Sequence, residues 1–354
     1  MVNARLSYLH DLETQRKPLL TVGSLRKAFG SRSHQVSALN GVDLAVYEQE
    51  VLTLLGPAGA GKSAVFAALA GAEKPDSGRI QLEGQELPKG SRALARVSTA
   101  FGPRQTVRDV LSTALKTRGV GRRDIEDEFG SVLKRIGHQR DPDVRVIELP
   151  ADQQLLLALA REGAAGARVA LLDDPLGPID HVLRDRTQDE IRAVQEEFGL
   201  SLVIATRNAQ QALSLSDRIA VILDGRIEQT GTPLEIYERP ASEQVAALIG
   251  AVNLLDPAVS VQLLNQAATF SVRPEKIRVV DGDYAAAADE VLAVGTVLRI
   301  VYLGATSRIT VRLDVGGSPI QVLRLNSAAP EDIPLMPGRR VTVVWPRRHA
   351  VRFA

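Results

Sequence analysis

Cysteine is the most informative absence in the sequence, because none of the 354 residues is a cysteine. Disulfides, cysteine-ligated zinc, iron–sulfur clusters and thiolate catalysis are therefore excluded, and the absence fits a cytosolic protein better than a small secreted one. A chain of this length can bury a core without such cross-links. At ~100–200 residues per domain it predicts two or three domains.

An excess of charge of one sign is also missing, since 43 Lys and Arg stand against 42 Asp and Glu, a net charge of +1. No global attraction to nucleic acid follows from this balance, and we expect no nucleic-acid partner. Long apolar runs are missing too: runs such as residues 155–160 are far shorter than the ~20 residues that span a bilayer. Residues 1–18 carry charges and no apolar core of a signal peptide. We expect neither a signal peptide nor a membrane span.

Short apolar runs alternate with longer helical stretches from residue 19 to about residue 249. This alternation predicts an α/β domain with a mostly parallel sheet covered by helices. The central strands are expected at residues 51–55, 169–172 and 201–205, which are almost continuously apolar. Residues 219–223 and 226–229 flank Asp224-Gly225, a pair that tolerates positive φ and therefore predicts a hairpin at an antiparallel edge.

The pattern changes after residue 240, where short runs are separated by Gly, Pro, Asp and Asn. This pattern predicts a small all-β domain, a barrel. Its strands are expected at residues 268–272, 295–302, 307–313, 319–323 and 340–345, with a loop or short helix at 282–289. The expected organisation is an N-terminal extension (1–18), an α/β domain (19–240) and an all-β domain (241–354).

Residues 56–63, Gly-Pro-Ala-Gly-Ala-Gly-Lys-Ser, match the phosphate-binding pattern G-x-x-x-x-G-K-[ST] in full. They follow a predicted strand and precede a helix expected at residues 63–70, which is the context the motif requires. The glycines let backbone N–H groups turn toward phosphate, and the helix N-terminus adds partial positive charge. They are Gly56, Gly59 and Gly61. The structural alternative is a glycine-rich turn with an incidental lysine.

The residue types around this loop predict ATP and Mg²⁺ as its ligands. Lys62 is expected to reach the β- and γ-phosphates, and Ser63 to ligate Mg²⁺. Asp173 and Asp174 follow the predicted strand 169–172, at the sheet edge that faces the nucleotide in such folds. Asp173 is expected to hold the metal with Ser63. An acidic pair after a strand is common, so this expectation depends on the phosphate-binding loop before it.

The order of these motifs resembles the ATP-binding subunits of ATP-binding cassette (ABC) importers. The resemblance covers residues 20–250, with Phe29 at the position of the aromatic ring that stacks on adenine, and residues 217–242 are typical of the importer branch. The C-terminal part resembles the oligosaccharide-binding-type (TOBE) regulatory domain of that branch. This part of the resemblance rests on residues 271–277, 302–304 and 344–345. Polyamine, iron, sulfate and sugar uptake systems share the pattern; the polyamine and sugar groups are nearest, and both stay open.

The resemblance implies a signature, Leu-Ser-Gly-Gly-Gln, that closes over the γ-phosphate bound by a second subunit. At that place this chain carries Leu149, Pro150, Ala151, Asp152 and Gln153. Pro150 lacks both the serine hydroxyl and a backbone donor, and Asp152 brings a carboxylate to a position that faces a triphosphate. In the structural alternative, Asp152 is an acid in the first turn of an ordinary helix, where it complements the helix dipole.

Further functional positions of the family also differ. The resemblance implies a water-polarising glutamate at Asp174 and a switch histidine at Arg207, and a glutamine that contacts the membrane partner aligns with Val97. Asp174 is one methylene shorter than glutamate, and an arginine cannot donate and accept in turn as neutral imidazole does. Asp180 keeps the aspartate of the family's dimer loop.

The resemblance implies an ATP-binding subunit that lies peripherally on the cytoplasmic face of the plasma membrane. Its expected partners are transmembrane permease subunits, a second ATP-binding subunit in a homodimer or heterodimer, and indirectly an extracytoplasmic solute-binding protein. The permease is expected to dock between residues 97 and 115. The substitutions predict impaired hydrolysis, and a non-hydrolysing scaffold or regulatory subunit beside an active ATPase stays open. A soluble ABC protein acting on DNA or ribosomes is disfavoured by the balanced charge and the C-terminal domain.

Overall fold

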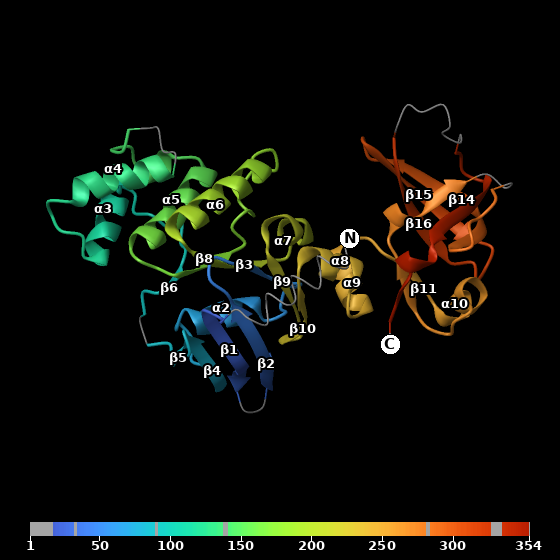
Figure 1. The fold of residues 1–354 in the computed structure, drawn as a ribbon, viewed down its shortest axis with the longest axis horizontal. Helices are drawn as coiled ribbons and strands as arrows, with labels where there is room; N and C mark the ends of the chain where they lie inside the picture. Colours follow the sequence, from blue (N-terminus) through green and yellow to red (C-terminus); the bar gives the residue numbers. More distant parts are fainter. Residues whose placement is uncertain are drawn as a thin grey trace. The chain divides into compact units, whose positions relative to one another are not determined.

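The computed structural model describes residues 17–31, 34–88, 91–136, 141–280, 284–326 and 335–353. The chain divides into two compact units, Met1–Pro233 and Leu234–Ala354 (Figure 1). Of the expected N-terminal extension, only Lys17 and Pro18 lie within the described residues. No helix in the described part of the chain is long and apolar enough to cross a membrane.

A six-stranded sheet in the order β10-β9-β3-β8-β7-β6 lies at the centre of the first unit. Its strands are β3 (Val51–Leu55), β6 (Leu94–Arg96), β7 (Val169–Asp173), β8 (Ser201–Thr206), β9 (Arg218–Leu223) and β10 (Arg226–Gly231). The predicted central strands are confirmed, and every residue of β3 and β8 is buried, as their apolar runs require. The predicted hairpin is also confirmed: β10 pairs antiparallel with β9 at the sheet edge, and Asp224 and Gly225 have φ values of 46° and 74°.

A second, antiparallel sheet of four strands in the order β2-β1-β4-β5 was not predicted. It contains β1 (Leu20–Ser31), β2 (His34–Val46), β4 (Ser77–Leu82) and β5 (Gln85–Glu86). Register shifts interrupt the pairing of β1 with β2, for example between Val22 and Leu25. A bulge breaks the alternation of apolar and polar residues by which a half-buried strand is recognised. One apolar cluster joins this sheet to the six-stranded sheet and to helix α2 (Lys62–Leu69).

Helices complete the first unit, and α2 confirms the helix expected after the glycine-rich loop. The others are α3 (Val107–Arg118), α4 (Ile125–Arg135), α5 (Ala151–Ala164), α6 (Arg184–Phe198) and α7 (Ala209–Leu215), with the short η1 (Val146–Glu148) before α5. Thr106 and Asp109 form a capping box that begins α3. Helices α3, α4 and α5 share an apolar cluster of their own, and Figure 1 shows α3 and α4 beside α5.

The second unit contains two sheets, which bears out its predicted β-rich character. One has the order β11-β12-β18, and the other β13-β17-β14-β15-β16. The strands are β11 (Asn253–Leu255), β12 (Phe270–Val272), β13 (Arg278–Val280), β14 (Glu290–Tyr302), β15 (Thr306–Leu313), β16 (Pro319–Leu325), β17 (Arg340–Pro346) and β18 (Val351–Arg352). Among the described strands, the larger sheet ends at β13 and β16 instead of closing on itself. Residues 284–289 form a loop, and 282–283 lie outside the described residues.

Helices of the second unit are α8 (Pro233–Glu238), α9 (Glu243–Ile249) and α10 (Pro257–Leu264), with η2 (Pro274–Lys276) and η3 (Arg347–His349). Arg273, only 6% exposed, ties α8 and α9 to the residue after β12. Its guanidinium donates to the carbonyl oxygens of Ala246, Gly250, Ala251 and Tyr237, and lies over the Tyr237 ring. The Ser-Val-Arg-Pro-Glu motif at residues 271–275 therefore has a structural role, because this arginine satisfies several carbonyls at once.

Candidate nucleotide site

The glycine-rich loop connects β3 to α2, and two of its glycines are required by close packing. A Cβ on Gly56 would lie 2.4 Å from the carbonyl oxygen of Ile222, and one on Gly61 would lie 2.6 Å from that of Ala38. Gly61 also has a φ of +106°, where side chains are strained. Gly59 has a φ of +79° but open space around it. The backbone at residues 56 and 61 thus leaves room for no other residue.

Backbone donors of the loop point to an anion as its ligand. The N–H groups of Gly61, Lys62 and Ser63 donate no hydrogen bond to any part of the chain that the structure describes. They lie at the N-terminus of α2, where unpaired N–H groups and the helix dipole favour negative charge. This arrangement fits the phosphates of a nucleotide.

Lys62 bends back over the loop. Its ammonium donates to the carbonyl oxygens of Gly56, at 2.6 Å, and Pro57, at 2.7 Å. Partial burial lowers the pKa of Lys62, and the positive charge of Arg207 lowers it further, while Asp173 and Asp174 oppose these effects. The structure therefore gathers these four charged side chains at the C-terminal ends of β7 and β8 and the start of α2.

The Asp224-Gly225 turn between β9 and β10 holds the glycine-rich loop in place through hydrogen bonds. The N–H of Gly225 donates to the carbonyl oxygen of Ala60 at 3.0 Å. Asn40 of β2 donates through its backbone to Gly225 and through its side chain to the carbonyl oxygen of Asp224. The sequence predicted this turn as a hairpin only; its contact with the phosphate-binding loop depends on residues far apart in the chain.

Phe29 lies on β1, with its side chain 42% exposed, opposite Val36 of β2. The Lys27 ammonium is 5.3 Å from the centroid of its ring. The same β2 strand carries Ala38, whose carbonyl oxygen lies against Gly61. Phe29 is therefore an exposed ring on the strand pair that abuts the glycine-rich loop, and it is available to stack on a base.

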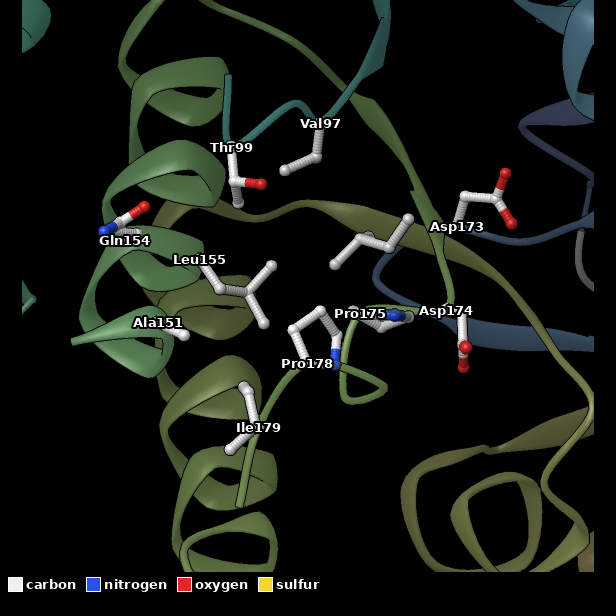
Figure 2. A pocket seen from close by; sticks show the side chains of 11 residues that line it. Val97, Thr99, Ala151, Gln154, Leu155, Asp173, Asp174, Pro175, Pro178 and Ile179 are labelled. Carbon is white, nitrogen blue, oxygen red and sulfur yellow. The ribbon is translucent and has the colours of Figure 1, made fainter. Parts of the chain in front are cut away.

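The acidic pair at the end of β7 has two different environments (Figure 2). Asp173 is exposed, and one of its carboxylate oxygens is 3.7 Å from a guanidinium nitrogen of Arg96, at the end of the neighbouring strand β6. Asp174 is partly buried and has a φ of 44°, and one of its carboxylate oxygens is 3.2 Å from the Thr206 hydroxyl, whose single proton is shared with the Gln211 side-chain oxygen at 3.0 Å. Its N–H donates to the carbonyl oxygen of Ala205. Neither Arg96 nor Thr206 was predicted from the sequence.

A pocket of about 240 Å³ lies beside these two carboxylates, at the N-terminal end of α5 (Figure 2). It is lined by Val97, Thr99, Ala151, Gln154, Leu155, Leu172, Asp173, Asp174, Pro175, Pro178 and Ile179. Val97 brings an apolar side chain to the position where the family resemblance implies a glutamine. The structure thus places Val97 and Ala151, which are far apart in sequence, at one pocket with the acidic pair.

The residues at the family's signature position begin α5. Leu149 is buried, whereas Pro150 and Ala151 are exposed. Pro150 occupies the N-cap position and makes no side-chain capping bond. Asp152 lies in the first turn and interacts electrostatically with Arg186 of α6. The side-chain oxygen of Gln153 is buried without a partner in the described part of the chain.

The two remaining predicted positions are exposed. Arg207 follows β8 and forms no ion pair with a residue that the structure describes. Asp180 accepts a hydrogen bond of 3.1 Å from the Val182 N–H, and this bond holds the pKa of Asp180 below its usual range. The His181 ring is 3.0 Å from the same carboxylate. Asp180 is therefore held in place by its own loop.

Comparisons with known proteins agree with both units. The ABC transporter family matches residues 39–177, and the TOBE domain family matches residues 270–353. A spermidine/putrescine import ATP-binding protein PotA of Oleidesulfovibrio alaskensis is 34% identical over 347 residues, covering 87% of this chain and 91% of its own. The protein of that name from Methylococcus capsulatus is 34% identical over 361 residues, covering 93% and 91%. An uncharacterized ABC transporter ATP-binding protein of Escherichia coli, YdcT, is 32% identical over 323 residues, covering 88% and 92%.

Solved structures match the fold of the α/β unit. CbiO1 from Clostridium perfringens, part of the ABC transporter complex cbiONQ, superposes with a TM-score of 0.56 at 23% identity, covering 62% of this chain and 90% of its own. A nucleotide-free ATP-binding cassette from an ABC transporter gives a TM-score of 0.52 at 20% identity, covering 61% and 92%. Because the PotA relatives match across both units, the chain belongs to the ATP-binding subunits of ABC importers that carry a C-terminal TOBE domain.

Proposed function

We propose that this chain binds ATP and Mg²⁺ at the loop of residues 56–63 and couples the nucleotide to a permease that imports a polyamine. The unpaired N–H groups at the start of α2, beside Lys62, are the observation that carries the ATP site. The polyamine class rests on the relatives named for spermidine and putrescine import. The chain would act peripherally, on the cytoplasmic face of the membrane.

Each binding role has a residue with suitable chemistry. The exposed Ser63 hydroxyl and the Asp173 carboxylate are oxygen ligands of the kind that Mg²⁺ prefers. When bound, the metal would neutralise part of the triphosphate charge. Lys62 exchanges its two loop carbonyls for phosphate oxygens, which are stronger acceptors. Phe29 stacks on adenine.

Hydrolysis by this chain is proposed to be weak, first because of Asp174. Its carboxylate accepts from the Thr206 hydroxyl and lies against the turn at Gly177, where an added Cβ would be 2.7 Å away. A carboxylate held there on the shorter side chain is poorly placed to polarise an attacking water. General-base catalysis requires hydrogen-bond reach of about 2.6–3.2 Å.

The start of α5 supplies the second reason. In a head-to-tail dimer the signature of one subunit faces the phosphates bound by the other. Pro150 and Ala151 are exposed at that position and offer no hydroxyl, and Asp152 adds negative charge next to them. A carboxylate near a γ-phosphate opposes closure, by a few kcal/mol at contact distance with an effective dielectric near ~20.

A non-hydrolysing subunit paired with an active ATPase is the second candidate. It is favoured because the substitutions affect both halves of a shared site: Asp174 and Arg207 on the nucleotide side, Pro150 and Asp152 on the closing side. A homodimer would carry both defects in each site. A heterodimer would carry one defect per site, so some turnover would remain.

Crosslinking tests the proposal that a permease docks between residues 97 and 115. Arg104 is exposed and suits a cysteine probe, whereas Arg108 pairs with Glu126 and Asp143 and lies over Phe129, so changing it would disturb the fold. The chain should be expressed with permease subunits, and Arg104→Cys treated in membranes with a reagent that joins a thiol to a nearby amine. We expect a product with the permease, and none from the exposed control Arg123→Cys. A permease product that forms only from an exposed cysteine introduced in the TOBE unit, with none from Arg104→Cys, would contradict the docking proposal.

Uptake of radiolabelled putrescine and spermidine by cells carrying this complex tests the solute class. We expect uptake that requires the chain and is lost in Lys62→Ala. Uptake of a sugar, with no polyamine uptake, would contradict it.

A further inference from the structure

Another pocket of the first unit lies where β1 and β2 meet the start of β10. Its volume is about 370 Å³, and it shares no lining residue with the pocket beside the acidic pair. Arg26 of β1 and Asn40 of β2 line it from directly opposite positions of the antiparallel pair, and Arg226 of β10 completes it. The fold thus brings two arginines that are far apart in sequence to one pocket.

Neither arginine of this pocket is neutralised. Arg26 and Arg226 are exposed, and neither forms an ion pair with a residue that the structure describes. The Arg26 guanidinium lies over the backbone of Gly41, where an added Cβ would be 3.4 Å from one of its terminal nitrogens. Two unpaired guanidinium groups at one pocket repel each other, and an anion between them replaces repulsion by attraction. The pocket therefore favours an anionic ligand.

A carboxylate in the same pocket adds a second requirement. Asp43 accepts a hydrogen bond of 2.8 Å from the Ser24 N–H through its Oδ1 atom, and its Oδ2 atom accepts none from a described residue. A free carboxylate oxygen repels a bare anion but accepts a hydrogen bond from a hydroxyl group. The lining therefore suits a small compound with a phosphate group at one end and a hydroxyl group at the other. The pocket volume is ordinary for a small-molecule site.

Asn40 connects this pocket to the glycine-rich loop. Its side chain donates to the carbonyl oxygen of Asp224 at 2.7 Å, and its backbone N–H donates to that of Gly225 at 2.8 Å. The N–H of Gly225 in turn donates to the carbonyl oxygen of Ala60 in the loop. Arg226 directly follows Gly225 in the chain. A ligand that binds Arg226 therefore restrains the turn that holds the loop.

We propose that this pocket is an effector site for a small phosphorylated hydroxy compound, and that its occupation strengthens ATP binding. Arg26 and Arg226 bind the phosphate through the parallel hydrogen bonds that a planar guanidinium offers, and Asp43 accepts from the hydroxyl. The restrained turn preorganises the loop, so less conformational freedom is lost when ATP binds. The effect on ATP rests on the proposed ATP site, whereas ligand binding in the pocket does not.

Glycerol 3-phosphate is the probe, because it carries one phosphate and two hydroxyl groups. Titration of the full chain, followed by the ³¹P signal of the probe, measures its Kd, which we expect below about 1 mM. Arg26→Gln and Arg226→Gln should each raise this Kd about tenfold, the effect of a lost hydrogen bond to a charged group. Methyl phosphate, which lacks the hydroxyls, should bind about tenfold more weakly than the probe, and Asp43→Ala should remove this preference.

Controls separate this pocket from the glycine-rich loop and from general charge. Lys62→Ala and the exposed Arg123→Gln should bind the probe as the parent does, and Arg226→Lys, which keeps the charge, should keep most of the affinity. Melting curves of the variants should match that of the parent. Equal probe affinity in the parent, Arg26→Gln and Arg226→Gln overturns the site.

Calorimetric titration with ATP, with and without saturating probe, tests the coupling. The probe should lower the ATP Kd of the parent about fivefold and leave that of Arg226→Gln unchanged. An ATP Kd of the parent that stays the same or rises with the probe overturns the effector role. Equal ATP affinity of Lys62→Ala and the parent overturns the ATP site itself, and the probe titrations would still decide whether the pocket binds its ligand.

Discussion

The side of the nucleotide site that would hold phosphate and the side that would close over it differ in how strongly the fold constrains them. Gly56 and Gly61 are surrounded so closely that a Cβ would meet a carbonyl oxygen at 2.4 or 2.6 Å. Pro150 and Ala151, on the closing side, are exposed. Substitution at the first pair is therefore expected to destabilise the fold, whereas substitution at the second pair should cost little stability.

An intact glycine pattern is therefore partly a requirement of the fold. Gly56 and Gly61 would be needed even in a protein that had lost ATP. Lys62 and Ser63 are different, because neither is buried, and the two carbonyl oxygens to which Lys62 donates belong to its own loop. These two side chains, and the unpaired N–H groups around them, are therefore the better argument that the chain still binds nucleotide.

The largest expected effect comes from restoring the family's residues at the substituted positions of the site. Asp174→Glu, Arg207→His, Pro150→Ser, Ala151→Gly and Asp152→Gly combined should raise ATP turnover by ~10²–10³ or more, the effect typical of one restored electrostatic group in an active site. The gain should exceed the product of the separate repairs, because groups that act as a unit are not additive. Phosphate release is the measurement. A combined variant no faster than the parent would mean that these positions do not limit hydrolysis.

Lys62→Ala should weaken ATP binding while leaving the stability of the fold almost unchanged. We expect ATP affinity to fall about 10–100-fold, since a charge-assisted phosphate contact is lost. The melting temperature should stay within about 3 °C, because the side chain is only partly buried. Calorimetry and a thermal melt on the same sample measure both. A large loss of stability with unchanged affinity would mean that Lys62 stabilises the fold and does not bind the phosphates.

Gly225→Ala should mainly lower the stability of the fold, and this effect is expected to be smaller. Gly225 has a φ of +74°, and its Cβ would lie 2.6 Å from the carbonyl oxygen of Ala38. Gly84 is the matched control, with a φ of +78° in a comparable hairpin turn and nothing within 4 Å. Both variants bear backbone strain, so Gly225→Ala should be less stable by a further ~1–3 kcal/mol from overpacking alone.

Urea denaturation of the two glycine variants measures that difference. We also expect weaker ATP binding in Gly225→Ala, because Gly225 holds the loop through Ala60. Equal stabilities of Gly225→Ala and Gly84→Ala would show that the turn at Gly225 is not closely packed against β2.

Local features of the fold were predictable from the sequence. The buried strands, the helix after the glycine-rich loop and the Asp224-Gly225 hairpin each depend on neighbouring residues. Helix α10 could also have been found, because Asp256 accepts from the Val259 N–H and Pro257 follows it, which is an ordinary N-terminal signal.

The remaining features depend on pairing between distant segments. Arg96 meets Asp173 only because β6 and β7 are adjacent parallel strands. Thr206 meets Asp174 because β8 lies beside β7. Neither pair has a local pattern, so no inspection of one segment could have found it.

ATP turnover by the purified chain, measured with ATP binding on the same sample, decides whether this chain binds ATP but hydrolyses it poorly. We expect saturable ATP binding with turnover at or below about 10⁻² per second, at least a hundredfold under the ordinary range of ~1–10³ per second. Lys62→Ala supplies the background from contaminating ATPases. Turnover of ~1 per second or faster that disappears in Lys62→Ala would contradict weak hydrolysis, and would mean that Asp174 and Arg207 support hydrolysis in the geometry they have.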